Sequence, residues 1–356
     1  MTMSSMTTSP SPPSPPSVIE DEAQLDDVLT RPRAELQTFI RQVRSPLLVL
    51  GAGGKMGATL AVLACRAAAA VGHALRVIAV SRFTNPAAKA WLTSHGVETI
   101  ACDLLEREAV ARLPDALDII YLVGLKFGTN QNPSLTWATN TIIPTNVAER
   151  FPQARIVALS TGNVYPLVPV AGGGATETHP LTPLGDYANA AIARERLFEF
   201  HAPRRGTRMV LVRLNYAVEL RYGVLHDLAC KVWEGEPVDV TTGYFNCIWQ
   251  GDANDRILRA LGLAAAPPLV LNLTGPDVLS VRQVATRLAE LMGRSPCFAG
   301  TEAGTALLNN PARACALLGP PPTPLEDMLR WTAHWVMRGG PSLNKPTHFE
   351  VRDGDF

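Results

Sequence analysis

The chain has 356 residues, of which 47% are apolar and 18% are charged, a composition that fits a soluble globular protein with a sizeable core. Lys and Arg together number 32, as do Asp and Glu, so no basic excess indicates a nucleic-acid or anionic-membrane partner. The six cysteines include no C-x-x-C pair, which argues against a disulfide framework or a zinc knuckle. The seven histidines form no closely spaced ligand pair, so we predict no metal site.

No segment predicts a membrane span or secretion. The most apolar long window, residues 60–80, is interrupted by Arg66, His73 and Arg76 and is too polar to cross a bilayer. No basic stretch followed by an apolar core opens the chain, so we expect no secretory signal. Together with the widely spaced cysteines, these features predict a cytoplasmic protein.

Two segments precede the first predicted strand. Residues 1–17 are almost wholly Ser, Thr, Pro and Met, which cannot form a core, and they predict a disordered tail. Residues 18–45 predict a polar leading helix.

From Pro46 onward, short apolar runs alternate with helical patterns. We predict strands at residues 46–51, 75–81, 97–102, 117–124, 154–160 and 208–214, with helices between them. Continuous apolar strands separated by helices predict an α/β fold, a Rossmann-type doubly wound parallel sheet with helices on both faces. We assign residues 46–215 to this nucleotide-binding domain.

After residue 215 the alternation loosens. Helices are predicted near residues 224–235, 252–263, 280–292 and 324–338. We assign residues 216–356 to a smaller, mostly helical substrate lobe, in which one strand at residues 268–274 returns to the core.

The segment VLGAGGKMG carries the first functional signal. It turns through Gly51, Gly54 and Gly57 between a strand and a helix, the context that makes a glycine triplet a dinucleotide-binding loop. The glycines permit the tight turn, and the free N–H groups at the helix start bind a pyrophosphate. At the end of the second strand, Ser81 stands where a carboxylate would select NAD, and Arg82 suits a 2′-phosphate. The sequence therefore predicts NAD(P) binding and favours NADP over NAD.

With these motifs, the chain resembles the extended short-chain dehydrogenase/reductase family, which includes NAD-dependent sugar epimerases and dehydratases. The likeness covers about residues 46–340 and includes the loop spacing G-x-x-G-x-x-G, CDLLE, VGLKFGT, LSTGNVYP and LTPLGDYANAA. The resemblance implies that loop residues Lys55 and Met56 lie at the cofactor. It also implies cofactor contacts from the third and fourth strand ends, by Asp103, Leu104, Gly124 and Lys126. Tyr187 takes the place of the catalytic tyrosine and Thr161 that of the catalytic Ser/Thr.

Three positions depart from the family pattern. Ala191 replaces the lysine that, in the family, binds the nicotinamide ribose and activates the tyrosine, so Tyr187 should be a poor base but a possible proton donor. Gly162 and Asn163 replace the acid pair of the dehydratases, which argues against dehydration. Phe245 replaces the arginine that holds the diphosphate of a nucleotide sugar.

Two cations are candidates to replace the lysine. Arg194 lies two helical turns after Tyr187 and is expected to lean toward the gap at Ala191, or else to be exposed or paired with Asp186 or Glu199. Lys126 is either at the cofactor or a solvated surface lysine. Asn215 follows the sixth strand, where it is a candidate substrate contact, and the helix predicted near residues 136–150 offers Asn140 as a structural hydrogen-bonder.

Three functional hypotheses follow. The first is an NAD(P)-dependent oxidoreductase or epimerase acting on a small, polar carbonyl or alcohol substrate. The second is a nucleotide-binding sensor or scaffold without turnover, as Ala191 suggests. The third and least favoured is a nucleotide-sugar epimerase. We also expect a homodimer, by family resemblance alone.

Overall fold

The computed structural model describes residues 16–125, 132–345 and 347–352. The predicted tail at residues 1–17 lies almost wholly outside these ranges, and so does Lys126. The description below concerns the described residues only.

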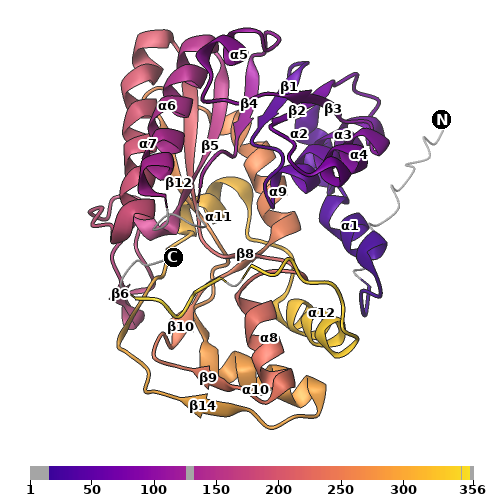
Figure 1. The fold of residues 1–356 in the computed structure, drawn as a ribbon, viewed down its shortest axis with the longest axis vertical. Helices are drawn as coiled ribbons and strands as arrows, with labels where there is room; N and C mark the ends of the chain where they lie inside the picture. Colours follow the sequence, from indigo (N-terminus) through magenta and orange to yellow (C-terminus); the bar gives the residue numbers. More distant parts are fainter. Residues whose placement is uncertain (1–15, 126–131, 346, 353–356) are drawn as a thin grey trace, which may run out of the picture.

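A seven-stranded parallel sheet forms the centre of the upper part of the molecule (Figure 1). Its strand order is β12-β7-β5-β4-β1-β2-β3, with every neighbouring pair parallel. The strands are β1 (Leu47–Leu50), β2 (Val77–Ser81), β3 (Glu98–Ala101), β4 (Asp118–Tyr121), β5 (Arg155–Thr161), β7 (Arg208–Leu214) and β12 (Leu269–Leu273). Because the order reverses beside β1, the sheet is doubly wound, and the predicted fold class is confirmed.

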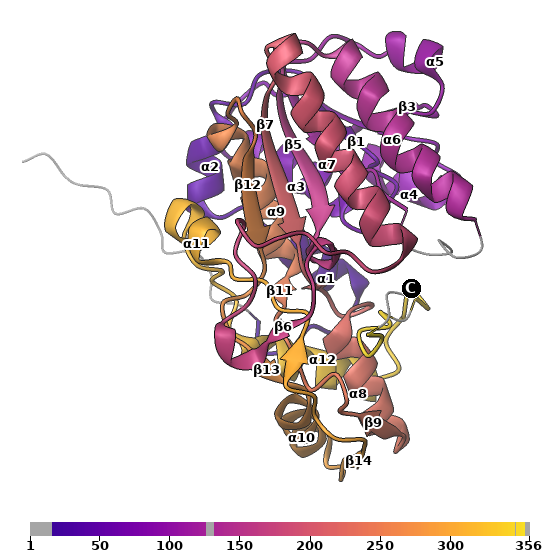
Figure 2. The ribbon, with the colours of Figure 1, turned by 90° about the vertical axis from the view of Figure 1, so that its left-hand side faces the viewer.

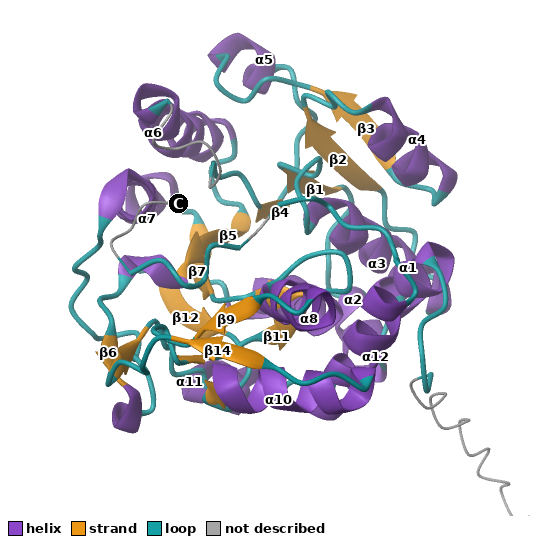
Figure 3. Cartoon of the chain, turned by 60° about the horizontal axis from the view of Figure 1, so that its bottom comes forward, coloured by secondary structure: helices purple, strands orange, loops and turns teal. Residues whose placement is uncertain are grey.

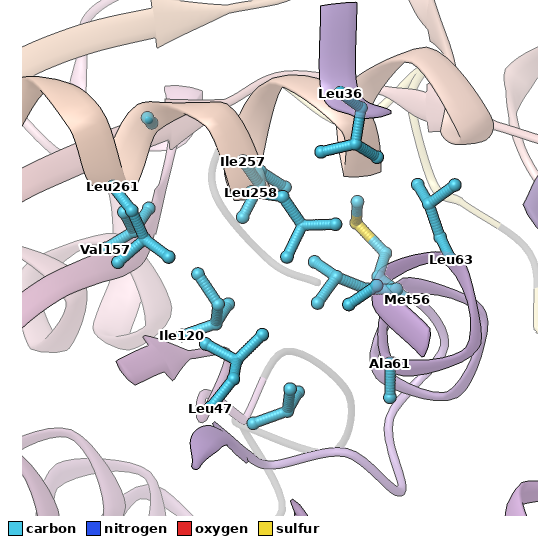
Figure 4. Packing of buried hydrophobic residues seen from close by; sticks show 14 of the residues in the cluster. Leu36, Leu47, Met56, Ala61, Leu63, Ile120, Val157, Ile257, Leu258 and Leu261 are labelled. Carbon is cyan, nitrogen blue, oxygen red and sulfur yellow. The ribbon is translucent and has the colours of Figure 1, made fainter. Parts of the chain in front are cut away.

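Helices cover both faces of this sheet (Figure 3). They are α2 (Ala34–Ile40), α3 (Gly57–Ala70), α4 (Pro86–Ser94) and α9 (Gln250–Arg259) on one face, and α5 (Arg107–Ala111), α6 (Pro133–Arg150) and α7 (Gly185–Arg205) on the other. Successive strand residues point to opposite faces, so Leu47 and Val49 pack against α3 while Leu48 and Leu50 pack against the α5–α7 face. Figure 4 shows the first of these clusters, to which Met56 and Leu63 contribute from the start of α3 and Ile257 and Leu258 from α9.

Most of the remaining elements lie below the sheet and form the candidate substrate lobe (Figure 2). Its main helices, α8 (Val224–Glu234), α10 (Val281–Met292) and α12 (Leu325–Met337), share one buried apolar cluster. The short elements are β6 (Val168–Pro169), β8 (Ala217–Val218), β9 (Pro237–Asp239), β10 (Tyr244–Phe245), β11 (Ile248–Trp249), β13 (Leu279–Ser280), β14 (Cys297–Ala299), β15 (Thr305–Ala306) and α11 (Ala312–Leu318), with the 3-10 turns η1 (Gly162–Val164), η2 (Val170–Gly172) and η3 (Ala260–Leu263). Of these, η3 and α11 pack against the sheet, since Ala260, Leu261 and Leu318 belong to its buried cluster.

Two helices differ from the expected organisation. The leading helix expected over residues 18–45 is two helices, α1 (Glu22–Thr30) and α2, because Pro32 between them interrupts the helical hydrogen bonding. Leu25 and Leu29 of α1 join the cluster of the lower lobe, whereas α2 packs on the sheet. The helix predicted near residues 252–263 is α9, which joins the sheet's layer rather than the lobe, since Ala253, Ile257 and Leu258 belong to the buried cluster that the sheet forms with α2 and α3.

A buried ion cluster anchors the edge of the sheet opposite the loops that carry the candidate site. Asp118, the first residue of β4, is fully buried and accepts hydrogen bonds from Arg155 at 2.7 and 2.6 Å. Arg44 donates to it as well, from its guanidinium and its backbone, both at 2.6 Å. Burial alone would raise the pKa of Asp118, but the hydrogen bonds from the two arginines outweigh it and hold the pKa below its usual value. Asp118 is therefore a stabilising carboxylate at neutral pH.

Candidate cofactor and active site

The turn between β1 and α3 can only be built with glycine at two positions. Gly51 has a φ of +84°, and a Cβ there would lie 3.0 Å from the backbone N of Val123. A Cβ on Gly57 would lie 2.5 Å from the Cα of Ala52. The loop therefore folds tightly back against the start of α3, where unpaired backbone N–H groups and the helix dipole favour an anion.

A cavity of about 280 Å³ lies beside this loop, at the carboxyl edge of the sheet. Its walls come from the loops that follow β1, β2, β3 and β4, and from one face of α6. The structure brings together here the predicted residues Gly51, Gly54, Ser81, Arg82, Asp103, Leu104 and Gly124. In open α/β sheets this crevice is where ligands bind, so its walls and glycine loop fit a dinucleotide.

The polar groups of the cavity have distinct surroundings. Asp103 accepts a hydrogen bond from the backbone N–H of Leu105 at 3.0 Å, which fixes the direction of its carboxylate. Ser81 lies against the phosphate loop, since a Cβ on Gly53 would be 2.5 Å from its Oγ. Arg82 follows on the exposed rim. The β2 end of the cavity thus presents a hydroxyl and a guanidinium.

The side chains of Lys55 and Met56 point away from this cavity. Met56 packs into the apolar cluster between α3 and α9 (Figure 4). The Nζ of Lys55 donates to the carbonyl of Ala217 at 2.6 Å and lies 3.9 Å from the ring centre of Tyr222. These two residues are in position to contact a cofactor only through their backbone.

The two predicted catalytic residues stand at the same sheet edge on different elements. Thr161 ends β5, and its buried hydroxyl donates to the Oδ1 of Asn163 at 3.0 Å and accepts from the Asn163 N–H at 3.2 Å. It therefore also caps the turn η1. Tyr187 is half-buried in the first turn of α7. Burial raises the pKa of Tyr222, and the charges of Asp227 and Tyr187 raise it further.

The structure shows what surrounds Ala191, at the position of the family's lysine, and where the side chain of Arg194 lies. Ala191 is fully buried in an apolar cluster with Val164 and Leu308, a setting that favours no charge. Arg194, 4% exposed, donates from Nη1 to the carbonyl of Val123 at 3.0 Å and to Asn140 Oδ1 at 2.6 Å. It therefore reaches the wall of the cofactor cavity, beside Gly124.

Arg194 also explains a glycine in the cavity wall. A Cβ on Gly124 would lie 2.8 Å from its Nη1, so Gly124 makes room for the guanidinium. Asn140 is the structural hydrogen-bonder that we expected, since it also donates to the Thr136 carbonyl at 2.8 Å. The predicted ion partners are engaged elsewhere, Asp186 with the indole of Trp137 and Glu199 with Arg196.

Sequence reasoning missed a buried polar network beneath the site. Arg213 of β7 pairs with Glu195 of α7 through two hydrogen bonds, at 3.0 and 2.6 Å. The Ser160 hydroxyl also donates to Glu195, while Arg213 donates to the Tyr165 hydroxyl at 2.7 Å. Tyr165 in turn donates to Asn272 of β12 at 2.8 Å. The network ties the carboxyl ends of three strands together, and a charged residue inside the apolar run RMVLVRL was its available signal.

A group of amides lies beside Thr161. Asn215, the predicted substrate contact, is buried and donates to Asn246 Oδ1 at 2.9 Å, and Asn246 donates to the Asn309 carbonyl at 2.6 Å. The side-chain amide of Asn309 is buried without a hydrogen-bond partner among the described residues. A Cβ on Gly162 would lie 2.8 Å from its Nδ2, so Asn309 fills the space where dehydratase-like sequences would place an acid.

Membrane spans and metal clusters are both absent from the described part of the chain. No helix there is long and apolar enough to cross a membrane. Within the same residues, no group of three or more His, Cys, Asp or Glu side chains is arranged to hold a metal ion.

Comparisons with known proteins agree with this geometry. The sequence model of the NAD dependent epimerase/dehydratase family matches residues 47–240, while no curated protein matches the sequence. Among solved structures, MoeE5 in complex with UDP-glucose and NAD is 23% identical with a TM-score of 0.67, over 83% of this chain and 99% of that one.

Two epimerase structures are similar in fold as well. The UDP-glucose 4-epimerase of Thermus thermophilus, in complex with NAD, is 21% identical with a TM-score of 0.64, over 81% of this chain and 98% of that one. The UDP-glucuronic acid 4-epimerase of Bacillus cereus, in complex with NAD, is 18% identical with a TM-score of 0.68, over 82% and 96%. At these identities the likeness establishes the fold, and the family match over more than half of the sequence establishes membership. The chain belongs to the NAD-dependent epimerase/dehydratase family, of the extended short-chain dehydrogenase/reductase type.

Proposed function

We propose that the protein is an NAD(P)-dependent oxidoreductase or epimerase that acts on a small, polar carbonyl or alcohol substrate. The observation that carries the proposal is the glycine turn at the start of α3, which opens into a cavity walled by four strand-end loops. Thr161 and Tyr187 stand at the same edge of the sheet. A bound nicotinamide cofactor would supply hydride chemistry there.

In this proposal, different residues bind the cofactor, transfer the proton and contact the substrate. The loop N–H groups around Gly54 bind the pyrophosphate, and Asp103 and Leu104 bind the adenine end. Tyr187 donates a proton to the substrate oxygen or takes one from it, and Thr161 hydrogen-bonds that oxygen. Asn215 contacts the substrate on the side of the lower lobe.

For the cofactor, we propose a preference for NADP over NAD, supported by Ser81 and Arg82 at the β2 end of the cavity. The solved relatives named above are complexes with NAD, so the preference concerns this chain's own residues. Arg82→Ala should weaken NADPH binding while leaving NADH binding nearly unchanged. Equal loss for both cofactors would contradict the assignment of Arg82 to the 2′-phosphate.

A nucleotide sugar is the less favoured substrate. Although relatives in the fold comparison carry UDP-glucose, Phe245 is 1% exposed here and packs at 6.4 Å, centre to centre, from Phe349. This apolar pair offers no charge to a diphosphate. Saturable binding of UDP-glucose to the NAD(H)-loaded protein would revive that hypothesis.

The second candidate function is a nucleotide-binding sensor without turnover. Ala191 favours it, because the site of the family's lysine is closed by apolar packing. The two candidates differ at Tyr187, which a sensor does not require. We keep a cytoplasmic location and a homodimer as parts of the proposal, the second to be tested by sedimentation.

The test begins with titration of the purified protein with NADPH and with NADH, followed by nicotinamide fluorescence and by thermal stability. Turnover is then sought with a panel of ketones, aldehydes and keto acids. Tyr187→Phe should abolish turnover and leave cofactor affinity nearly intact. Tight cofactor binding without turnover on any substrate would favour the sensor, and binding of neither cofactor would refute the proposal.

A further inference from the structure

A second cavity, of about 260 Å³, shares no lining residue with the cofactor cavity. Its walls come from β11, from the loop between β12 and β13, and from the start of α12. Trp249, Leu279, Leu325 and Met328 line it together with four prolines, and Asp277 is its only charged lining residue in the described part of the chain. We call this mostly apolar site the α12 cavity.

The first described residues of the chain run along α12 toward this cavity. The carboxylate of Glu20 lies 3.4 Å from Nε2 of His334. Four residues earlier in the chain, the carbonyl of Pro16 accepts a hydrogen bond from Nε1 of Trp331 at 2.9 Å. Met328 lines the cavity and lies three residues before Trp331, on the same face of the helix. The chain before Pro16 is therefore directed to the end of α12 where the cavity lies.

The contact at Pro16 and the cavity share an aromatic wall. The ring of Trp331 meets that of Trp249 edge to face, with the ring centres 5.3 Å apart, and Trp249 lines the cavity. A segment in the polyproline II conformation has no internal hydrogen bonds and docks in aromatic-lined grooves. The bond from Trp331 to the carbonyl of Pro16 and the adjacent ring of Trp249 match both properties.

The sequence that precedes this contact has the period of a polyproline II ligand. Residues 9–17 read SPSPPSPPS, and this conformation has three residues per turn. The residues therefore form three edges, of which one holds Pro10, Pro13 and Pro16, another Pro12 and Pro15, and the third Ser11, Ser14 and Ser17. At the described end of this run, Ser17 is exposed while Pro16 and Val18 are half-buried. The serine edge thus faces solvent where the chain meets α12, and the proline edges face the protein.

We propose that the α12 cavity is the docking site of residues 9–15 of this chain, which lie outside the described residues. The distances allow it, because Met328 is about 4.5 Å from Trp331 along the helix axis and a polyproline II chain advances about 3.1 Å per residue. Two residues before Pro16 reach the cavity, and the other prolines extend across it. The many prolines also reduce the conformational entropy that docking costs. This inference goes beyond the proposed function and involves neither cofactor nor substrate.

The experiment compares the full chain with a variant that lacks residues 2–15, and it uses a synthetic peptide of residues 1–15 as the probe. The peptide contains no aromatic residue, so a change in tryptophan emission reports on the protein alone. We expect a saturable change with the truncated variant. Binding of the peptide to the full chain should be at least about tenfold weaker, because the tethered segment competes at an effective concentration of about millimolar.

Each contrary outcome has a distinct meaning. Equal peptide affinity for the full chain and the truncated variant would show that the segment does not occupy the cavity in the full chain. Failure of the peptide to bind the truncated variant would show that the cavity does not accept it. Sedimentation tests a third occupant, since self-association that is lost on truncation would place the segment in the cavity of a second copy. Any of these results would overturn docking within one chain.

Matched substitutions test the site and the edges of the ligand. Leu325 lines the cavity, whereas Leu317 of α11 is 47% exposed and lies outside it. In the truncated variant, Leu325→Glu should weaken peptide binding at least about tenfold, and Leu317→Glu should leave it unchanged, with thermal melting as the check that both are folded. In the peptide, Pro13→Gln should weaken binding and Ser14→Gln should not. Equal effects of the two peptide substitutions would contradict the assignment of edges.

Discussion

Glycine-to-alanine substitutions in the phosphate loop test two requirements separately: the close packing at Gly57 and the cavity wall at Gly54. A Cβ on Gly57 would lie 2.5 Å from the Cα of Ala52, whereas carbon atoms make contact at about 3.5 Å. In Gly57→Ala the backbone must therefore shift by about 1 Å at the entry of α3. Overpacking of this kind costs about 1–3 kcal/mol of stability.

The same shift should weaken cofactor binding. An N–H bond to a charged acceptor contributes about 1.5–3 kcal/mol, so losing one of them lowers affinity by about 10- to 150-fold. Gly54→Ala should behave differently, because its Cβ would be 3.4 Å from the Gly51 carbonyl, an ordinary contact. We expect Gly54→Ala to keep the wild-type melting temperature and still to weaken binding, since Gly54 lines the cavity.

The assay combines thermal unfolding of the ligand-free protein with fluorescence titration by NADPH and NADH. Gly304→Ala is the matched control, because no atom lies within 4 Å of its added Cβ, and it should change neither property. Wild-type stability and wild-type affinity in Gly57→Ala would refute the reasoning and assign the loop to packing alone.

Three further predictions follow from buried groups. Glu195→Gln leaves Arg213 buried without a counter-charge and should lower the free energy of unfolding by about 3–5 kcal/mol. Glu98→Gln, at an exposed ion pair, should lower it by less than about 1 kcal/mol. Equal losses in chemical denaturation would contradict the argument from burial. The pKa of Asp118 is lowered by its two arginines despite burial, so its contribution is complete above the unfolded value of about 3.9 and is lost as the pH falls below it. Denaturation between pH 3 and 6 should show a smaller acid loss in Asp118→Asn than in the wild type. Gly162→Asp should lower the melting temperature because its Cβ meets Asn309, and adding Asn309→Ala should restore part of the loss; no recovery would mean that the strain lies elsewhere.

The sequence predicted the fold and the family correctly for a local reason. Apolar runs such as LLVL and RMVLVRL are too short for buried helices and lie at regular intervals between helical patterns. Strands with such sequences are buried on both faces, and right-handed crossover connections between them produce a doubly wound parallel sheet. The glycine spacing of residues 51–57 is also a local pattern, because the tight turn that it permits depends only on neighbouring residues. The sheet order and the family match confirm both predictions.

The assignment of elements after residue 215 depended on packing that local patterns do not contain. The helix α9 has the same amphipathic pattern as the helices of the lower lobe, but its apolar side meets α2 and α3. Whether an amphipathic helix covers one core or another is decided by which surface lies opposite it. For the same reason, α1 packs in the cluster of the lower lobe while α2 packs in the cluster of the sheet. The domain boundary and the catalytic roles stay predictions.

The directions of long charged side chains were decided by the tertiary structure alone. Helical spacing places Arg194 on the face of Tyr187, yet its guanidinium lies between the loop after β4 and α6, because Val123 and Asn140 offer acceptors there. Lys55 sits in a cofactor motif, yet its flexible stem carries the ammonium to Ala217 and Tyr222. A sequence determines which backbone a glycine loop needs, since that is local sterics. A charged group at the end of a long, flexible side chain goes where distant segments supply its partners, and only the folded chain brings those segments together.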